Sequence, residues 1–179
     1  MHCYFKWLLA VVMLISPLAQ AAHHESGAPE PTVIGSSISD DGSVHPLYAG
    51  DAALAQIWVD YIEAHNKRDF DAIAAINAES WEGYLPTGES VKGNEAHIAF
   101  LREWLGSSQN PSWTIKWMVA NSGVNAEGAM EHWLTTGNDI TYFDDAGAEI
   151  VEHHVHDVQI VDGKIAKIYV YARAKTQGE

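Results

Sequence analysis

A single carboxylate in an otherwise apolar strand face is the feature of this sequence that most suggests chemistry. Asp162-Gly163 predicts a tight turn that joins two strands within residues 149–175. Counting back from the turn places Asp157 opposite Ile168. Because side chains alternate between the two faces of a strand, Asp157 then shares a face with apolar residues. A buried carboxylate is costly unless it is protonated or paired, so we expect Asp157 to lie in a dry pocket as a hydrogen-bond donor.

Tyr61 and His132 are the candidate partners of Asp157. Tyr61 falls at the centre of the apolar stripe of a helix predicted from Asp51 to about Asn66. Two donors in a dry cavity, Tyr61 and Asp157, could stabilise a developing enolate. His132, on an apolar strand face, is the candidate base. The alternatives are a structural Tyr–Asp hydrogen bond and a core histidine, and both stay open.

The run His153-His154-x-His156 is similar to a metal cluster at first sight. On a strand, His154 and His156 share one face while His153 points the other way. No third ligand stands at close spacing, so we predict no metal site. Tyr169 and Tyr171 are expected on the same face as His154 and His156, which favours an aromatic contact surface there.

The remaining pattern predicts helices first and strands afterwards. Asp69 is expected to cap a second helix over 70–77, and Asn94 a third that stops at Gly106. Four or so antiparallel strands follow, from Trp113 onward. This order indicates an α+β domain, a curved sheet around helices that encloses an apolar cavity. The expected cavity walls are apolar and mostly aromatic: Trp58, Trp81, Leu85, Leu101, Trp104, Trp117, Trp133, Val155, Ile168 and Val170.

The N-terminal part predicts export. Residues 1–22 combine Lys6, an apolar run and Ala19-Gln20-Ala21, which is typical of a cleaved signal peptide. Residues 23–50 have the composition of a flexible linker, with a stretch near Val44 that could dock on the domain at 51–175. The formal charge of −14 argues against nucleic-acid binding, and Cys3 is the only cysteine. We therefore expect a periplasmic or secreted protein that is free of the membrane once the signal is cleaved.

Three stretches resemble the NTF2-like superfamily and, within it, SnoaL-like domains. They are WVDYIEAHNKRDFDAIAAI, LPTGESVKGNEAHIAFLREW and HDVQIVDGKIAKIYVYAR, and together they span about Ala52 to Arg173. The resemblance implies a cone-shaped barrel, with three N-terminal helices packed in a curved antiparallel sheet. It also implies a homodimer through the outer sheet face.

The resemblance to ketosteroid isomerases within this superfamily implies roles for particular residues. Tyr61 falls on the position of their oxyanion-hole tyrosine, and Asp157 falls on that of their protonated aspartic acid. The general base of these isomerases stands just before a Pro-x-Gly, where this sequence has Leu85. The oxyanion pair is thus expected without the usual base.

Two functions stay open on the sequence. One is a cofactor-free isomerase, dehydratase or cyclase that acts on a small apolar carbonyl compound. The other is a non-catalytic module that binds a small apolar ligand or serves as a dimeric scaffold. A base close to Asp157 within the same cavity would favour the enzyme.

Overall fold

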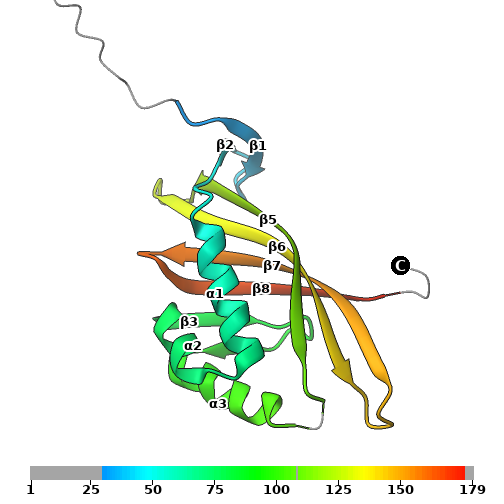
Figure 1. Cartoon of the computed structure of the whole chain (residues 1–179). Helices are drawn as coiled ribbons and strands as arrows, with labels where there is room; N and C mark the ends of the chain where they lie inside the picture. The colour runs from blue at the N-terminus through cyan, green and yellow to red at the C-terminus, as the bar shows by residue number, and fades with distance from the viewer. Residues whose placement is uncertain (1–29, 108, 176–179) are drawn as a thin grey trace, which may run out of the picture. The chain divides into compact units, whose positions relative to one another are not determined.

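The computed structural model describes residues 30–107 and 109–175. Its elements mix helices and strands along the chain (Figure 1). In order they are β1 (Val33–Ile38), β2 (Val44–Ala49), α1 (Leu54–Lys67), α2 (Phe70–Ile76), β3 (Asn77–Tyr84), β4 (Ser90–Lys92), α3 (Asn94–Leu105), β5 (Ser112–Val124), β6 (Met130–Phe143), β7 (Glu149–Val161) and β8 (Lys164–Ala174).

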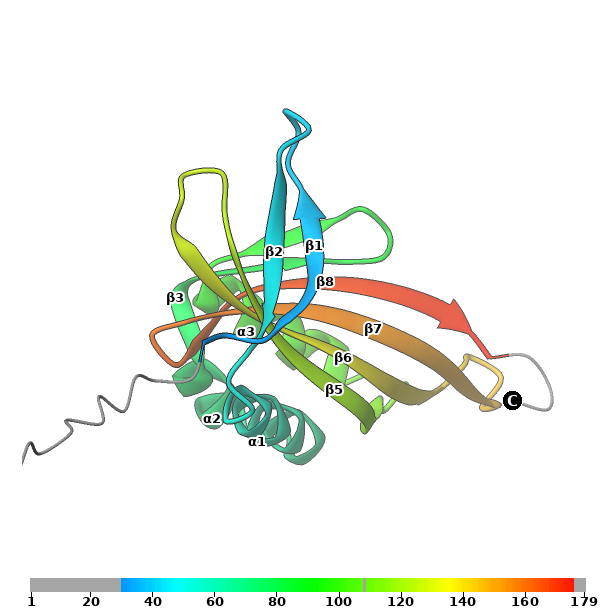
Figure 2. The ribbon, with the colours of Figure 1, turned by 90° about the horizontal axis from the view of Figure 1, so that it is seen from above.

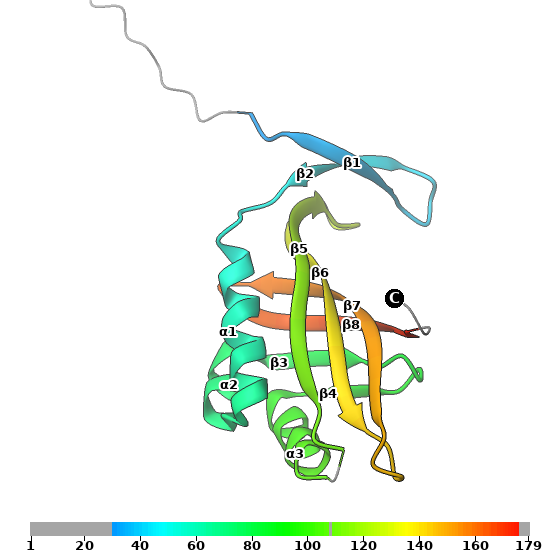
Figure 3. The ribbon, with the colours of Figure 1, turned by 45° about the vertical axis from the view of Figure 1, so that its right-hand side comes forward.

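The described strands form one curved sheet in the order β1-β2-β5-β6-β7-β8-β3-β4. Its two ends, β1 and β4, are not paired with each other, so the sheet stays open where the resemblance implied a barrel. Neighbouring strands are antiparallel except β3 and β8, which run parallel. All three helices of the described chain lie against one face of this sheet (Figure 3). We call that face the inner face and the opposite one the outer face.

The predicted order, with every helix ahead of the strands, is wrong in two places. The β1–β2 hairpin precedes α1, and β2 pairs with β5, so residues 33–49 extend the sheet where the composition predicted a flexible linker (Figure 2). The β3–β4 hairpin stands between α2 and α3, where no strand was predicted. The predicted signal peptide, residues 1–22, lies outside the described residues. None of the described helices is long and apolar enough to cross a membrane.

Local sequence explains where the helices begin and end. The Asp69 carboxylate accepts a hydrogen bond from the Ala72 amide at 3.0 Å, which caps α2 as predicted. Asp51 stands three residues before α1 and bonds the Ala53 amide at 2.8 Å, so it closes the turn that leads into the helix. Gly106 ends α3. Side-chain capping is thus seen at the start of α2, whereas no side chain of the described residues caps the start of α1 or α3.

The Asp162-Gly163 turn forms as predicted, with φ angles of 51° and 72°, and Val161 pairs with Lys164. The register changes a few residues further on. Ile160 pairs with Ile165 but Gln159 pairs with Lys167, so Ala166 is an extra residue, a β-bulge, in β8. As a result Asp157 pairs with Tyr169 rather than with Ile168. Beyond the bulge Ile168 and Val170 pair with Val158 and His156 on the inner face, so Asp157, which alternates with these two residues along β7, faces outward.

A second irregularity, in β5, has the same consequence. Ile115 pairs with Asn138 and Trp117 with Gly137, which leaves Lys116 as an extra residue. Trp113 and Ile115 pack against the core, whereas Trp117 is 41% exposed on the outer face. The bulges of β5 and β8 therefore decide which side chains of the sheet face the helices.

Candidate functional site

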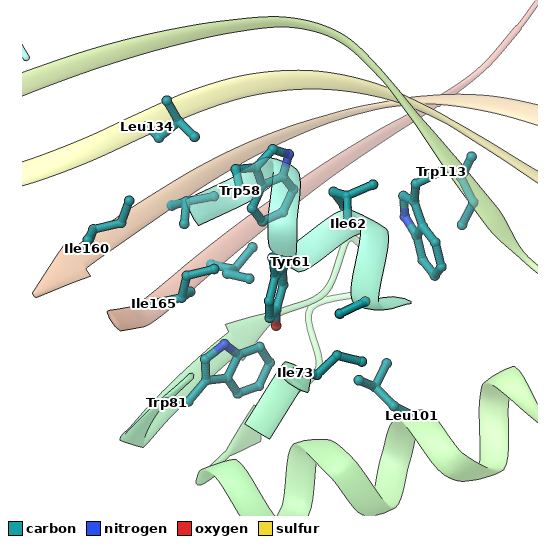
Figure 4. Packing of buried hydrophobic residues seen from close by; sticks show 14 of the residues in the cluster. Trp58, Tyr61, Ile62, Ile73, Trp81, Leu101, Trp113, Leu134, Ile160 and Ile165 are labelled. Atoms are coloured by element: carbon teal, nitrogen blue, oxygen red, sulfur yellow. The ribbon is translucent and has the colours of Figure 1, made fainter. Parts of the chain in front are cut away.

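A small apolar cavity lies between the helices and the inner face of the sheet. Its volume is about 90 Å³, and its walls come from α1, α3, β3, β7 and β8 with Trp113 of β5. Figure 4 shows Trp58, Tyr61 and Ile62 of α1 between the strands on one side and Trp81 and Leu101 on the other. Aromatic rings are in contact around the cavity, with Trp58 and Tyr61 centroids 5.4 Å apart. We call it the inner cavity.

Most of the predicted wall residues line the inner cavity. Those that line it come from both helices and strands: Trp58, Trp81, Leu85, Leu101, Trp104, Ile168 and Val170. Tyr61 lines it too. Leu85 closes the strand end at the position where the resemblance expected a base, so an apolar side chain occupies that wall.

Three predicted wall residues are not in the cavity. Trp117 follows the bulge in β5 and lies over Gly137 on the outer face. Val155 alternates with the buried His154 and His156 and faces outward with its pair Tyr171. Trp133 also faces outward, where its ring stacks on Tyr169 with centroids 6.2 Å apart.

The placement of Asp157 in the cavity is also wrong. Asp157 lines a shallow groove of the outer face with Trp133 and Tyr169, and its carboxylate accepts a hydrogen bond from the Thr135 hydroxyl at 2.7 Å. The bulge at Ala166, which the sequence pattern does not reveal, is the physical reason. His132 shares a face with Leu134, as expected, but it is exposed at the start of β6 and is not part of the cavity wall. The predicted set of Tyr61, Asp157 and His132 is not assembled.

Three histidines that were not among the predicted site residues line the inner cavity instead: His65 of α1, His97 of α3 and His156 of β7. His65 lies on the buried stripe of α1. The ring of His97 stacks on Trp81 with centroids 3.7 Å apart. His156 is buried on the inner face of β7.

The three cavity histidines are buried, and burial controls their protonation. It lowers the pKa of His65 to about 4 and those of His97 and His156 to about 3. Nδ1 of each ring is held at 2.8–3.0 Å: in His65 by the Tyr61 carbonyl, in His97 by Asn77, and in His156 by Asn138. All three rings are therefore neutral near pH 7.

The Tyr61 hydroxyl points toward Trp81 (Figure 4). Burial raises the pKa of Tyr61, and the side chains of Trp81 and Asn77 oppose part of that rise. The Tyr61 hydroxyl, Asn77 Oδ1 and Trp81 Nε1 are all buried and make no hydrogen bond within the described chain. Tyr61 thus stays a neutral phenol at the polar end of the cavity.

A wider groove of about 560 Å³ adjoins the inner cavity, and the two share Leu85, Trp104 and His156 among their walls. The groove contains a pair of groups suited to proton transfer. His154 Nε2 lies 2.9 Å from Glu152 Oε2, and the Tyr142 hydroxyl donates to Glu152 Oε1 at 2.9 Å. The hydrogen bond from His154 is the main cause that lowers the pKa of Glu152. The rings of His154 and His156 are 5.8 Å apart, so the pair stands next to the cavity.

No cluster of three or more His, Cys, Asp or Glu side chains able to hold a metal ion occurs in residues 30–107 and 109–175. The cavity itself offers three neutral imidazoles and a phenol among aromatic walls. Such a set can bind an uncharged ligand through hydrogen bonds, while the carboxylate lies outside, in the groove.

Comparisons with known proteins agree with this fold. The model of the SnoaL-like domain matches residues 58–168, more than half of the chain, so the protein belongs to the SnoaL-like domain family. No curated protein matches.

Solved structures with the NTF2-like fold are similar to this one. A proposed ketosteroid isomerase from Kribbella flavida is 16% identical, with a TM-score of 0.54 over 70% of this chain and 82% of its own. An LEH-like epoxide hydrolase from M. tuberculosis is 16% identical, with a TM-score of 0.53 over 67% and 82%. A proposed SnoaL-like polyketide cyclase from Shewanella denitrificans is 12% identical, with a TM-score of 0.52 over 69% and 92%. At these identities the likeness shows the fold alone.

Proposed function

We propose that this chain is a cofactor-independent acid–base enzyme, an isomerase, dehydratase or cyclase, that acts on a small and largely apolar carbonyl compound. The observation that carries the proposal is the adjacency of two compartments. An aromatic cavity with buried, neutral polar groups opens beside a groove that holds a His–Glu pair. The first suits binding of an uncharged ligand, and the second suits proton transfer.

In this proposal His154 is the general base. Glu152 holds Nε2 of the ring at 2.9 Å, which orients the imidazole and stabilises the imidazolium that forms when Nδ1 takes a proton. Tyr142 fixes Glu152 in turn. A ketone whose carbonyl oxygen lies in the inner cavity would present its α-carbon toward the groove. Proton loss there gives an enolate-like species, and return of the proton to another carbon completes an isomerisation.

The relatives support the same range of reactions. Proteins with this fold include those described as a ketosteroid isomerase, an epoxide hydrolase and a polyketide cyclase. A non-catalytic binding module is the second candidate. It is favoured by the outward position of Asp157 and by Leu85 at the expected base position, because the isomerase-like constellation is then incomplete.

Export and dimerisation are further parts of the proposal. The composition of residues 1–22 supports a signal peptide and a periplasmic or secreted location. A homodimer through the outer face is supported by aromatic side chains there, since Trp133 stacks on Tyr169 and Tyr171 is 57% exposed.

Proton exchange tests the catalytic proposal without knowledge of the substrate. Acetophenone in D₂O exchanges its α-protons slowly, and an enzyme that forms enolates accelerates the exchange. We expect the protein to accelerate it and the His154→Gln variant to lose on the order of 100-fold of that rate. His153→Gln is the matched control, because His153 faces outward and contacts Asp139 at 3.1 Å. Ketone binding with exchange no faster than in buffer would favour the binding module.

A further inference from the structure

Each of the three cavity histidines has its Nδ1 atom next to a group whose hydrogen-bonding polarity is fixed. The position of the proton on each neutral ring therefore follows from the contacts, one ring at a time. What results is the arrangement of donors and acceptors that the inner cavity presents to a ligand.

The tautomer of His156 is set through Asn138, whose side chain is fully buried. Trp58 Nε1 lies 3.2 Å from Asn138 Oδ1, and an indole nitrogen can only donate. The orientation of the amide is thereby fixed, with Nδ2 of Asn138 2.8 Å from Nδ1 of His156. An amide nitrogen also only donates, so Nδ1 accepts and the proton of His156 is on Nε2.

The tautomer of His97 is set through two amides. Asn94 Nδ2 donates to the Ala74 carbonyl at 2.9 Å, which leaves Asn94 Oδ1 to accept from Asn77 Nδ2 at 2.9 Å. The other hydrogen of Asn77 Nδ2 is directed to His97 Nδ1 at 3.0 Å. His97 therefore accepts at Nδ1 and, like His156, carries its proton on Nε2.

His65 has the opposite tautomer. Its Nδ1 atom lies 2.8 Å from the backbone carbonyl of Tyr61, and a carbonyl oxygen can only accept. The proton of His65 is consequently on Nδ1, and Nε2 is a bare acceptor. Within the described residues, Nε2 of none of the three rings has a hydrogen-bond partner, so these rings offer two donors and one acceptor at the cavity.

We infer that the inner cavity is a binding site for an uncharged hydroxy ketone, with a carbonyl oxygen on the Nε2–H of His97 or His156 and a hydroxyl donating to Nε2 of His65. This inference rests on the proposed function and deepens it by naming the substrate class. A simple ketone leaves the His65 acceptor unpaired, and an unpaired polar atom in a dry site weakens binding. A ligand with a carboxylate should bind weakly, because the carboxylate would lose its hydration and find no cationic partner among the cavity residues.

Two measurements on the full chain test the inference. Nitrogen NMR of the histidine rings at pH 7 should show Nε2–H for His97 and His156 and Nδ1–H for His65. Any other assignment overturns the donor and acceptor arrangement. Equilibrium titration should then rank the probes, with α-hydroxyacetophenone at least about 10-fold tighter than acetophenone and benzoate weakest. Equal affinity for the two ketones, or tighter binding of benzoate, overturns the substrate class.

A variant isolates the acceptor. His65→Phe keeps an aromatic ring but removes Nε2, so the preference for α-hydroxyacetophenone should fall to near unity while acetophenone binds within about 3-fold of its original affinity. A preference that survives this change overturns the role of His65. The matched control is His132→Phe, at an exposed position of β6, which should keep the full preference. If His65→Phe does not fold, NMR of the unmodified chain still decides the tautomers.

Binding and catalysis are separable in these experiments. Titrations in the His154→Gln background should give the same ranking of probes, because His154 is in the groove. Loss of proton exchange with the ranking retained supports both proposals. If wild-type protein shows the ranking but no exchange, the binding site stands and the catalytic proposal fails.

Discussion

The two faces of β7 differ more sharply than their sequence suggests. His154, His156, Val158 and Ile160 alternate along the inner face and are buried, whereas Val155, Asp157 and Gln159 alternate along the outer face and are partly exposed. His156 is neutral because burial excludes water around its ring and lowers its pKa to about 3. The Asp157 carboxylate on the outer face is partly exposed to solvent and accepts a hydrogen bond from the Thr135 hydroxyl. The chemistry of each β7 side chain therefore depends on its face, and the bulge in β8 decides which β8 residues share that face.

A charge placed on either face should give the largest contrast. Val158 is fully buried, so Val158→Asp puts an unpaired carboxylate in the core and should cost about 4 kcal/mol or more, enough to unfold much of the protein. Asp157→Val, one residue earlier, loses only the bond to Thr135 and should change stability by about 1 kcal/mol. Urea denaturation of both variants measures the difference. Similar losses for the two would contradict the assigned faces.

The pH dependence of stability should reflect the buried histidines. An unfolded histidine binds a proton below about pH 6.5, whereas burial keeps the pKa values of His65, His97 and His156 at about 3 to 4 in the folded protein. Below pH 6.5 the unfolded state thus binds more protons, and stability falls as the pH falls toward 4. The slope is up to about 1.4 kcal/mol per pH unit for each ring.

Denaturation midpoints between pH 7 and pH 5 measure that slope. Glu152 and Asp139 contribute little in this window, because their lowered pKa values place their losses below pH 5. The His132→Gln variant is the control, because His132 is at an exposed position of β6, outside the cavity. A flat profile would show that the three rings are not held neutral.

Replacing a glycine by alanine on each face of the sheet should give a smaller difference in stability. A Cβ atom at Gly83 would lie 2.3 Å from the Trp81 ring inside the cavity, and one at Gly137 would lie 2.1 Å from Trp117 Nε1 on the outer face. Trp81 is 4% exposed and has no room to move, whereas Trp117 is 41% exposed and can turn away. Gly83→Ala should cost about 2 kcal/mol and Gly137→Ala less than 1 kcal/mol by thermal unfolding. A larger loss at Gly137 would argue that Trp117 is fixed.

Much of the fold followed from local pattern. The apolar stripe of α1, the Asp69 cap and the Asp162-Gly163 turn all depend on neighbouring residues, and all were predicted correctly. Most of the cavity wall could be predicted as well, because Trp58, Leu101 and Ile168 lie on the apolar faces of their own helices and strand. The β1–β2 hairpin was missed because its two short strands lie in a segment rich in Gly, Ser, Pro and Asp, which has the composition of a linker.

The prediction of the site residues failed at the two bulges. Neither Lys116 nor Ala166 is a residue type that marks a bulge, so alternation was continued through both positions and the faces of Trp117 and Asp157 were exchanged. His97 was missed for another reason. Its partner Asn77 is 20 residues away, and no local pattern reports a hydrogen bond at that separation.

Thiol labelling tests the assignment of the faces of β7 most directly. Cys3 is the only cysteine, so a single new thiol can be followed once Cys3 is replaced by serine. When Asp157→Cys and Val158→Cys are compared under native conditions, we expect a maleimide to react at least about 10-fold faster at position 157, and position 158 to react only on unfolding. Equal or faster native labelling at position 158 would overturn this assignment, and with it the placement of His156 at the inner cavity and of His154 in the adjoining groove.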